Sequence, residues 1–158
     1  MAAIRGGILR VEANVDRALL GASLAFAGAT ALGSVVALRN GLPGRPLGLS
    51  VPLSVPAGLL AGWGAGVAAP WPMPVAAVLA AVSARRPNAT ARVGAVCVAV
   101  GLLCIAGTVV EPVTHQPQSW SAATGIAIGV NLAASAVLIR AGLRQSVAAR
   151  SHRRDAPA

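Results

Sequence analysis

Four long stretches of the chain are free of charged residues, and short polar or basic segments separate them. A helix rises about 1.5 Å per residue, so about 20 apolar residues match the hydrocarbon core of a bilayer. The stretches hold between 18 and 26 uncharged residues and cover 18–38, 57–82, 93–110 and 121–139. The pattern predicts an all-α integral membrane protein, a four-helix bundle with four spans.

The second stretch contains a helix-breaking segment at its centre. Pro70, Pro72 and Pro74 lie within five residues, and each lacks the backbone N–H that a helix interior needs. Two interpretations remain open. Either one long tilted span is kinked there, or the second helix is broken and two half-segments meet inside the membrane.

Both ends of the chain are basic and lie outside the four stretches. In residues 1–17, apolar residues recur at helical spacing, which favours a cytoplasmic segment with a short helix on the membrane surface. In residues 140–158 the basic tail either continues the last span as a helix on anionic lipid or is a disordered tail. In the helical case Arg140, Arg144 and Arg150 would contact lipid headgroups.

Composition excludes an ordinary soluble domain. Of the 158 residues, 56% are hydrophobic and 11% are charged, with a mean hydropathy of +0.72. Soluble domains contain about 45–50% apolar and about 25% charged residues. The net charge of +9 would suggest nucleic acid in a soluble protein. The aromatic content of 3% offers little stacking surface, however, so nucleic acid is not an expected partner.

The arginines predict how the chain is oriented. Eleven of the thirteen lie in segments that four spans would place on one side, and two lie on the other. Basic residues in short loops favour the cytoplasmic side. We therefore expect an inner (plasma) membrane protein with both termini in the cytoplasm, and the use of arginine without lysine is typical of a GC-rich bacterium.

Small residues recur every four positions in three of the stretches, which is the spacing that lets membrane helices approach closely. The glycines in this pattern are Gly21, Gly33, Gly58, Gly62, Gly66, Gly125 and Gly129. Abundant alanine and glycine also produce such spacing by chance. Packing within the bundle is favoured over a homo-oligomer, because four helices offer one another enough partners.

Three polar residues are the candidates for a chemical site. Asn131 lies near the middle of the last stretch and should face the bundle interior, because an unbonded amide is costly in hydrocarbon. Glu111 precedes Pro112, and His115 follows four residues later. This pair could act as acid and base or hold a cation, or could be two solvated loop residues.

The chain shows no motif for phosphate, dinucleotide or metal binding and no nucleophile elbow, so neither a cofactor nor a metal is expected. Its two cysteines are spaced too far apart on one helix for a disulfide. The sequence therefore favours a non-enzymatic membrane protein that packs with itself or with a larger complex. The alternative is a small transporter or membrane enzyme with a cavity between helices for an apolar or weakly polar molecule.

Overall fold

The computed structural model describes the backbone of residues 2–86, 91–117 and 120–155, and the side chains of 14–86, 91–117 and 120–151. The described residues are all-helical, with five α-helices and short 3-10 turns. The α-helices are α1 (Ala2–Asn40), α2 (Val55–Ala61), α3 (Pro72–Ser83), α4 (Ala91–Val110) and α5 (Ala122–Asp155).

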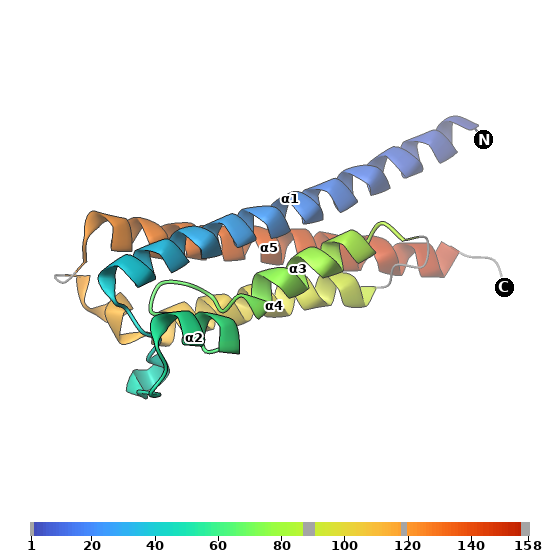
Figure 1. Cartoon of the computed structure of the whole chain (residues 1–158). Coiled ribbons are helices and arrows are strands. Elements are labelled where there is room, and N and C mark those ends of the chain that lie inside the picture. Colours follow the sequence, from blue (N-terminus) through green and yellow to red (C-terminus); the bar gives the residue numbers. More distant parts are fainter. Residues whose placement is uncertain (1, 87–90, 118–119, 156–158) are drawn as a thin grey trace.

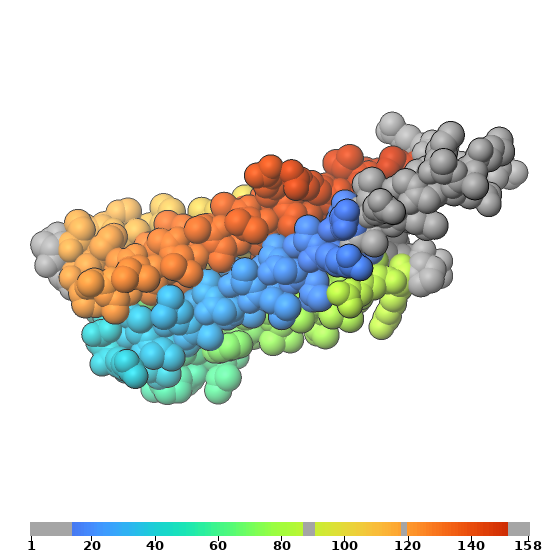
Figure 2. All heavy atoms as spheres, turned by 90° about the horizontal axis from the view of Figure 1, so that it is seen from above, coloured from blue at the N-terminus to red at the C-terminus, as the bar shows by residue number. Residues whose placement is uncertain are grey.

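The helices form an elongated bundle in which α1, α3, α4 and α5 run along one common direction (Figure 1). Helix α5 packs most extensively against α4 and then against α1, while α3 contacts both α1 and α4. Seen from above, α1 and α5 lie side by side over most of their described length (Figure 2). The two chain termini lie at the same end of the bundle (Figure 1).

Three helices of the described chain are long and apolar enough to cross a membrane. They comprise Asn14–Asn40 within α1, Ala91–Val110 (α4) and Ala122–Ser151 within α5. Helix α3 is apolar but has only 12 residues, so it is about 18 Å long, which is shorter than the hydrocarbon core. The structure thus has three complete candidate spans where the sequence pattern predicted four.

A single kinked helix over 57–82 is wrong, because two separate helices occupy this stretch. Helix α2 ends at Ala61, where Gly62 adopts the left-handed conformation (φ 91°) that favours glycine. The chain is then irregular to Trp71, and α3 begins at Pro72. Pro72 and Pro74 therefore lie in the first turn of α3, where the missing N–H groups have no partner to lose.

The N-terminal segment differs from the expected surface helix, whereas the basic C-terminal segment is helical, which is one of the two alternatives that the sequence left open. Residues 2–17 belong to α1 without interruption, so they do not form a separate surface helix. At the other end, α5 continues through the basic segment to Asp155, and residues 156–158 lie outside the described part. A continuous α1 of 39 residues is about 58 Å long and extends beyond a hydrocarbon core of about 30 Å.

The core consists of two apolar clusters along the bundle axis. One cluster surrounds the fully buried Phe26 and Leu138 and includes Cys97, and the other surrounds Val36, Val67 and Ile128. Many buried positions are alanine, which lets the helices approach closely. Polar side chains of α1 and α5, including Thr30 and Asn131, are also fully or almost fully buried.

Candidate functional site

Asn131 links α5 to α1 and to the irregular segment between α2 and α3. Its side chain is 1% exposed. Its Nδ2 donates to the carbonyl oxygens of Val67 at 3.0 Å and Ala29 at 3.3 Å, and to Ala127 of its own helix at 3.0 Å. One amide thus holds backbone carbonyls from two other parts of the chain.

The polar groups around Asn131 are only partly satisfied. Its Oδ1 and the Oγ1 of Thr30 are buried without a hydrogen-bond partner among the described residues. The hydroxyls of Ser34 and Ser135 donate to carbonyls one turn back in their own helices. The unpaired oxygens offset part of the stabilisation that the three amide bonds provide.

The irregular segment 62–71 is neither helix nor strand, yet its residues 64–70 are all buried. Backbone groups in such a segment need partners, because hydrocarbon supplies none. Ala65 and Ala68 exchange two backbone hydrogen bonds of 3.0 Å, Gly66 N donates to Leu42 O at 3.2 Å, and Trp71 N donates to Leu59 O at 2.9 Å. The carbonyl of Val67 receives its bond from Asn131. The segment is therefore held by protein on several sides.

Glu111 is a buried carboxylate at the end of α4, with 7% of its surface exposed. Both of its oxygens accept the backbone N–H of Arg45, at 3.0 Å each. Burial raises the pKa of the Glu111 carboxyl above its ordinary value, and the N–H and positive charge of Arg45 offset part of that rise. The carboxylate anchors the loop after α1 against the end of α4.

His115 is exposed and caps the same helix. Its Nε2 lies 2.7 Å from the carbonyl oxygen of Val109, and Thr114 Oγ1 donates to the carbonyl of Thr108 at 2.7 Å. The last carbonyls of a helix have no partner within the helix. The Thr114 hydroxyl satisfies one of them, and His115 satisfies a second in the tautomer that carries its proton on Nε2. The local role of His115 is thus to end α4.

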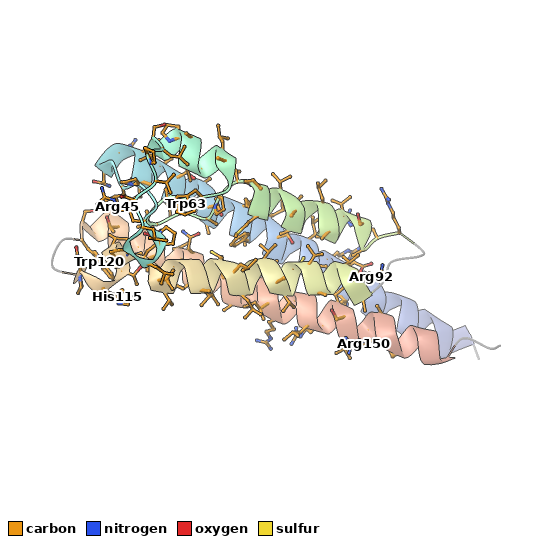
Figure 3. All side chains as sticks on the ribbon, turned by 90° about the horizontal axis from the view of Figure 1, so that it is seen from below. Arg45, Trp63, Arg92, His115, Trp120 and Arg150 are labelled. Atoms are coloured by element: carbon orange, nitrogen blue, oxygen red, sulfur yellow. The ribbon has the colours of Figure 1, made fainter. Side chains whose placement is uncertain are left out.

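The three candidates do not converge on one another. Arg45, Trp63, His115 and Trp120 gather at the end of the bundle opposite Arg92 and Arg150 (Figure 3). In the described part of the chain, Glu111, His115 and Asn131 each bond to backbone groups and not to one another. A catalytic pair of Glu111 and His115 would need a further positioned group, and the described bonds supply none.

A half-open pocket of about 240 Å³ lies between the irregular segment and α4. Trp63, Pro70 and several glycines and alanines of residues 62–69 form one wall, and Cys104, Thr108 and Glu111 lie on the other. Asn131 and His115 are not among the residues that line it. The broken segment therefore shapes a pocket that Glu111 reaches, while the amide of Asn131 is bonded to backbone carbonyls away from this pocket.

The predicted packing glycines fall into two groups. A methyl group at Gly33 would meet the Val67 carbonyl and lie 2.9 Å from Asn131 Nδ2, and one at Gly58 would lie 2.7 Å from Gly64 O. Methyl groups at Gly66 and Gly125 would come within 3.4 and 3.3 Å of side chains. Gly21, Gly62 and Gly129 have open space around that position.

The closest helix approach uses glycines outside the predicted set. A methyl group at Gly94 would overlap the Gly142 carbonyl, and one at Gly142 would lie 2.6 Å from Gly94 O. At Gly101 it would lie 2.9 Å from Ser135 O. Gly94 and Gly101 are seven residues, or two helical turns, apart and therefore lie on the same face of α4. This spacing is the feature of the sequence that indicates a close approach at these two glycines.

Two arginines of the predicted lipid-contact set share one surface. Arg140 and Arg144 line a groove between α1 and α5, whereas Arg150 is exposed further along α5 and does not line it.

Comparison with known protein families, curated proteins and solved structures found no match. A functional assignment therefore has to come from the geometry of this chain.

Proposed function

We propose that the protein crosses the membrane four times. Helices α1, α4 and α5 each make one crossing, and the fourth is made jointly by α2, segment 62–71 and α3. The internal bonding of the irregular segment supports this proposal, because non-helical backbone at membrane depth requires protein partners. Short, broken segments of this kind occur in membrane proteins where they are buried among complete helices.

Both termini would then lie in the cytoplasm, on the inner face of a plasma membrane. Two observations support this orientation. The two termini lie at the same end of the bundle (Figure 1), and Arg92 and Arg150 lie at the end opposite Arg45 (Figure 3). Arginine on the cytoplasmic side agrees with the positive-inside bias.

Cysteine labelling from one side of the membrane tests the orientation. In a variant without Cys97 and Cys104, we expect an impermeant maleimide added to intact cells to modify Leu47→Cys and to spare Arg86→Cys. Leu47 is 75% exposed and Arg86 is also exposed, so access to the thiol does not limit either reaction. The reverse pattern would invert the orientation, and labelling of both from outside would contradict the fourth crossing.

For the function itself we propose a non-enzymatic membrane component that acts by packing, either with a second copy or within a larger complex. The observation that carries this proposal is Asn131. Its amide lies at the centre of the bundle, where it is bonded to three backbone carbonyls, and Asn131 lines neither of the two pockets described among residues 14–86, 91–117 and 120–151. A transporter would need a route past this level between the helices.

The two native cysteines of α4 test whether such a route opens. Cys97 is fully buried among α1, α3 and α4, with its Sγ 3.8 Å from Ala77 O. In lipid vesicles we expect a membrane-permeant maleimide to leave Cys97 unmodified until the protein is denatured. The Cys104→Ser variant assigns the label to Cys97, and mass spectrometry measures it. Rapid modification of Cys97 in the folded protein would contradict a packed interior and favour the transporter.

The pocket beside Glu111 favours a second candidate function, the binding of a small molecule. Its volume of about 240 Å³ is below the usual range for ligand sites, and its walls are apolar apart from Cys104, Thr108 and Glu111. Under this function an impermeant maleimide should reach Cys104 from the outer side while Cys97 stays protected. Protection of Cys104 would remove the support for a functional pocket.

A further inference from the structure

The groove between the first half of α1 and the middle of α5 combines an apolar floor with positive charge. Its volume is about 500 Å³. Arg140 and Arg144 lie one turn apart on α5 and are both exposed. Of the described residues that line the groove, none is acidic. Two arginine side chains therefore line one groove, and the described part of its lining supplies no opposite charge.

The remaining wall of the groove is apolar or small. It is formed by Val15 and Ala18 of α1 and by Val137 and Ala141 of α5. Helical spacing continues these faces toward the bundle centre through Ala25 on α1 and Ala133 on α5, which are both exposed. A narrow apolar path thus leads away from the two arginines along the two helices.

The position of the groove matches the boundary of the hydrocarbon core. The uncharged stretch of α1 begins at Ala18, and that of α5 ends at Ile139. Arg140 follows directly after Ile139, and Arg144 lies one helical turn further on. Arg150 lies at this same end of the bundle (Figure 3). In a bilayer, a charged side chain at this height meets the phosphate groups of lipids.

We propose that this groove is a binding site for one anionic phospholipid, with its phosphate on Arg140 and Arg144 and an acyl chain along the floor between α1 and α5. Guanidinium groups bind phosphate oxygens with paired, charge-assisted hydrogen bonds. The two arginines, with no acidic residue among the described residues of the lining, favour a lipid with net negative charge over a zwitterionic one. This site is independent of the packing function proposed above and requires only that the protein lies in a membrane.

Native mass spectrometry of the full-length protein in detergent measures this site directly. We expect one phosphatidylglycerol to remain bound, with phosphatidylcholine held much more weakly. Each arginine should contribute about fivefold to the affinity, so Arg140→Gln/Arg144→Gln should bind phosphatidylglycerol about 25-fold more weakly. The matched control is Arg150→Gln, which makes the same change on the same helix outside the groove and should bind as the unmodified chain does.

A second variant separates the apolar floor from the charge. Ala18 is exposed at the groove, so Ala18→Phe should occupy the acyl path, leave both arginines in place and still weaken binding of phosphatidylglycerol. Equal affinity for phosphatidylcholine, or an unchanged affinity in the double arginine variant, would overturn the proposal. Inorganic phosphate that competes as strongly as the lipid would overturn it too, because the groove would then recognise a free anion.

Discussion

Gly94→Ala should be among the most destabilising single substitutions in this chain. A methyl group there would overlap the Gly142 carbonyl and lie 2.9 Å from Ser146 N. These are backbone atoms of a neighbouring helix, so α4 and α5 would have to move apart along the most extensive contact of the bundle. Overpacking of this kind costs about 3 kcal/mol. For a chain of this length that corresponds to a melting temperature about 6–12 °C lower.

Thermal unfolding in detergent can be followed by the exposure of Cys97 and Cys104, which are both buried in the folded protein. Gly107→Ala is the matched control, because it adds the same methyl group to the same helix at a position with open space. It should melt at the original temperature or up to about 4 °C higher, since alanine favours a helix over glycine by about 1 kcal/mol. Equal melting of both variants would show that α4 and α5 do not approach as closely as described.

The helical architecture could be predicted from the sequence because hydrophobic run length is a local property. The uncharged stretches 18–38 and 93–110 lie within α1 and α4, and the stretch 121–139 lies within α5 except for its first residue. The positions of the helix ends could not be predicted from the charged residues that bound each stretch. Arginines do not stop a helix, so α5 continues past Ile139 through the basic segment, and α1 includes residues 2–17.

The sequence predicts that the second stretch contains a break, but it does not predict the residue at which the preceding helix ends. Three prolines indicate that a regular helix cannot cross residues 70–74. The same prolines are well tolerated in a first helical turn, where Pro72 and Pro74 are found. The preceding helix ends earlier, at Gly62, and stretch length alone gives no reason to choose this glycine over its neighbours.

The partners of the polar candidates could not be predicted, because they are distant in the sequence. Glu111 bonds to the backbone of Arg45, 66 residues away, and Asn131 bonds to Ala29, 102 residues away. Backbone N–H and carbonyl groups are shared by almost all residue types. A sequence motif therefore does not identify which of them a side chain will bind. The glycine contacts have the same limitation, since Gly33 and Gly21 share one helix and one spacing but only Gly33 meets another segment.

Asn131→Ala should lower the stability of the protein by about 2–4 kcal/mol. The substitution removes two hydrogen bonds to other segments, and such bonds between membrane helices contribute about 0.6–2 kcal/mol each. It also leaves the Val67 carbonyl without its Asn131 donor inside a segment that is neither helix nor strand. The melting temperature, followed by exposure of the native cysteines, should fall by roughly 4–16 °C. The protein should also be less abundant in membranes.

Two further variants identify the cause of that loss. Asn131→Leu keeps most of the side-chain volume without the amide, so a similar loss would assign the effect to hydrogen bonding and not to an empty space. Asn40→Ala removes the same amide from the exposed end of α1, where its described bond is to Val36 O of its own helix at 2.9 Å, and should change stability by less than about 1 kcal/mol. If Asn131→Leu were as stable as the unmodified chain, the irregular segment would be held by its own backbone bonds. Asn131 would then be free for another role, and the packing proposal would lose its main support.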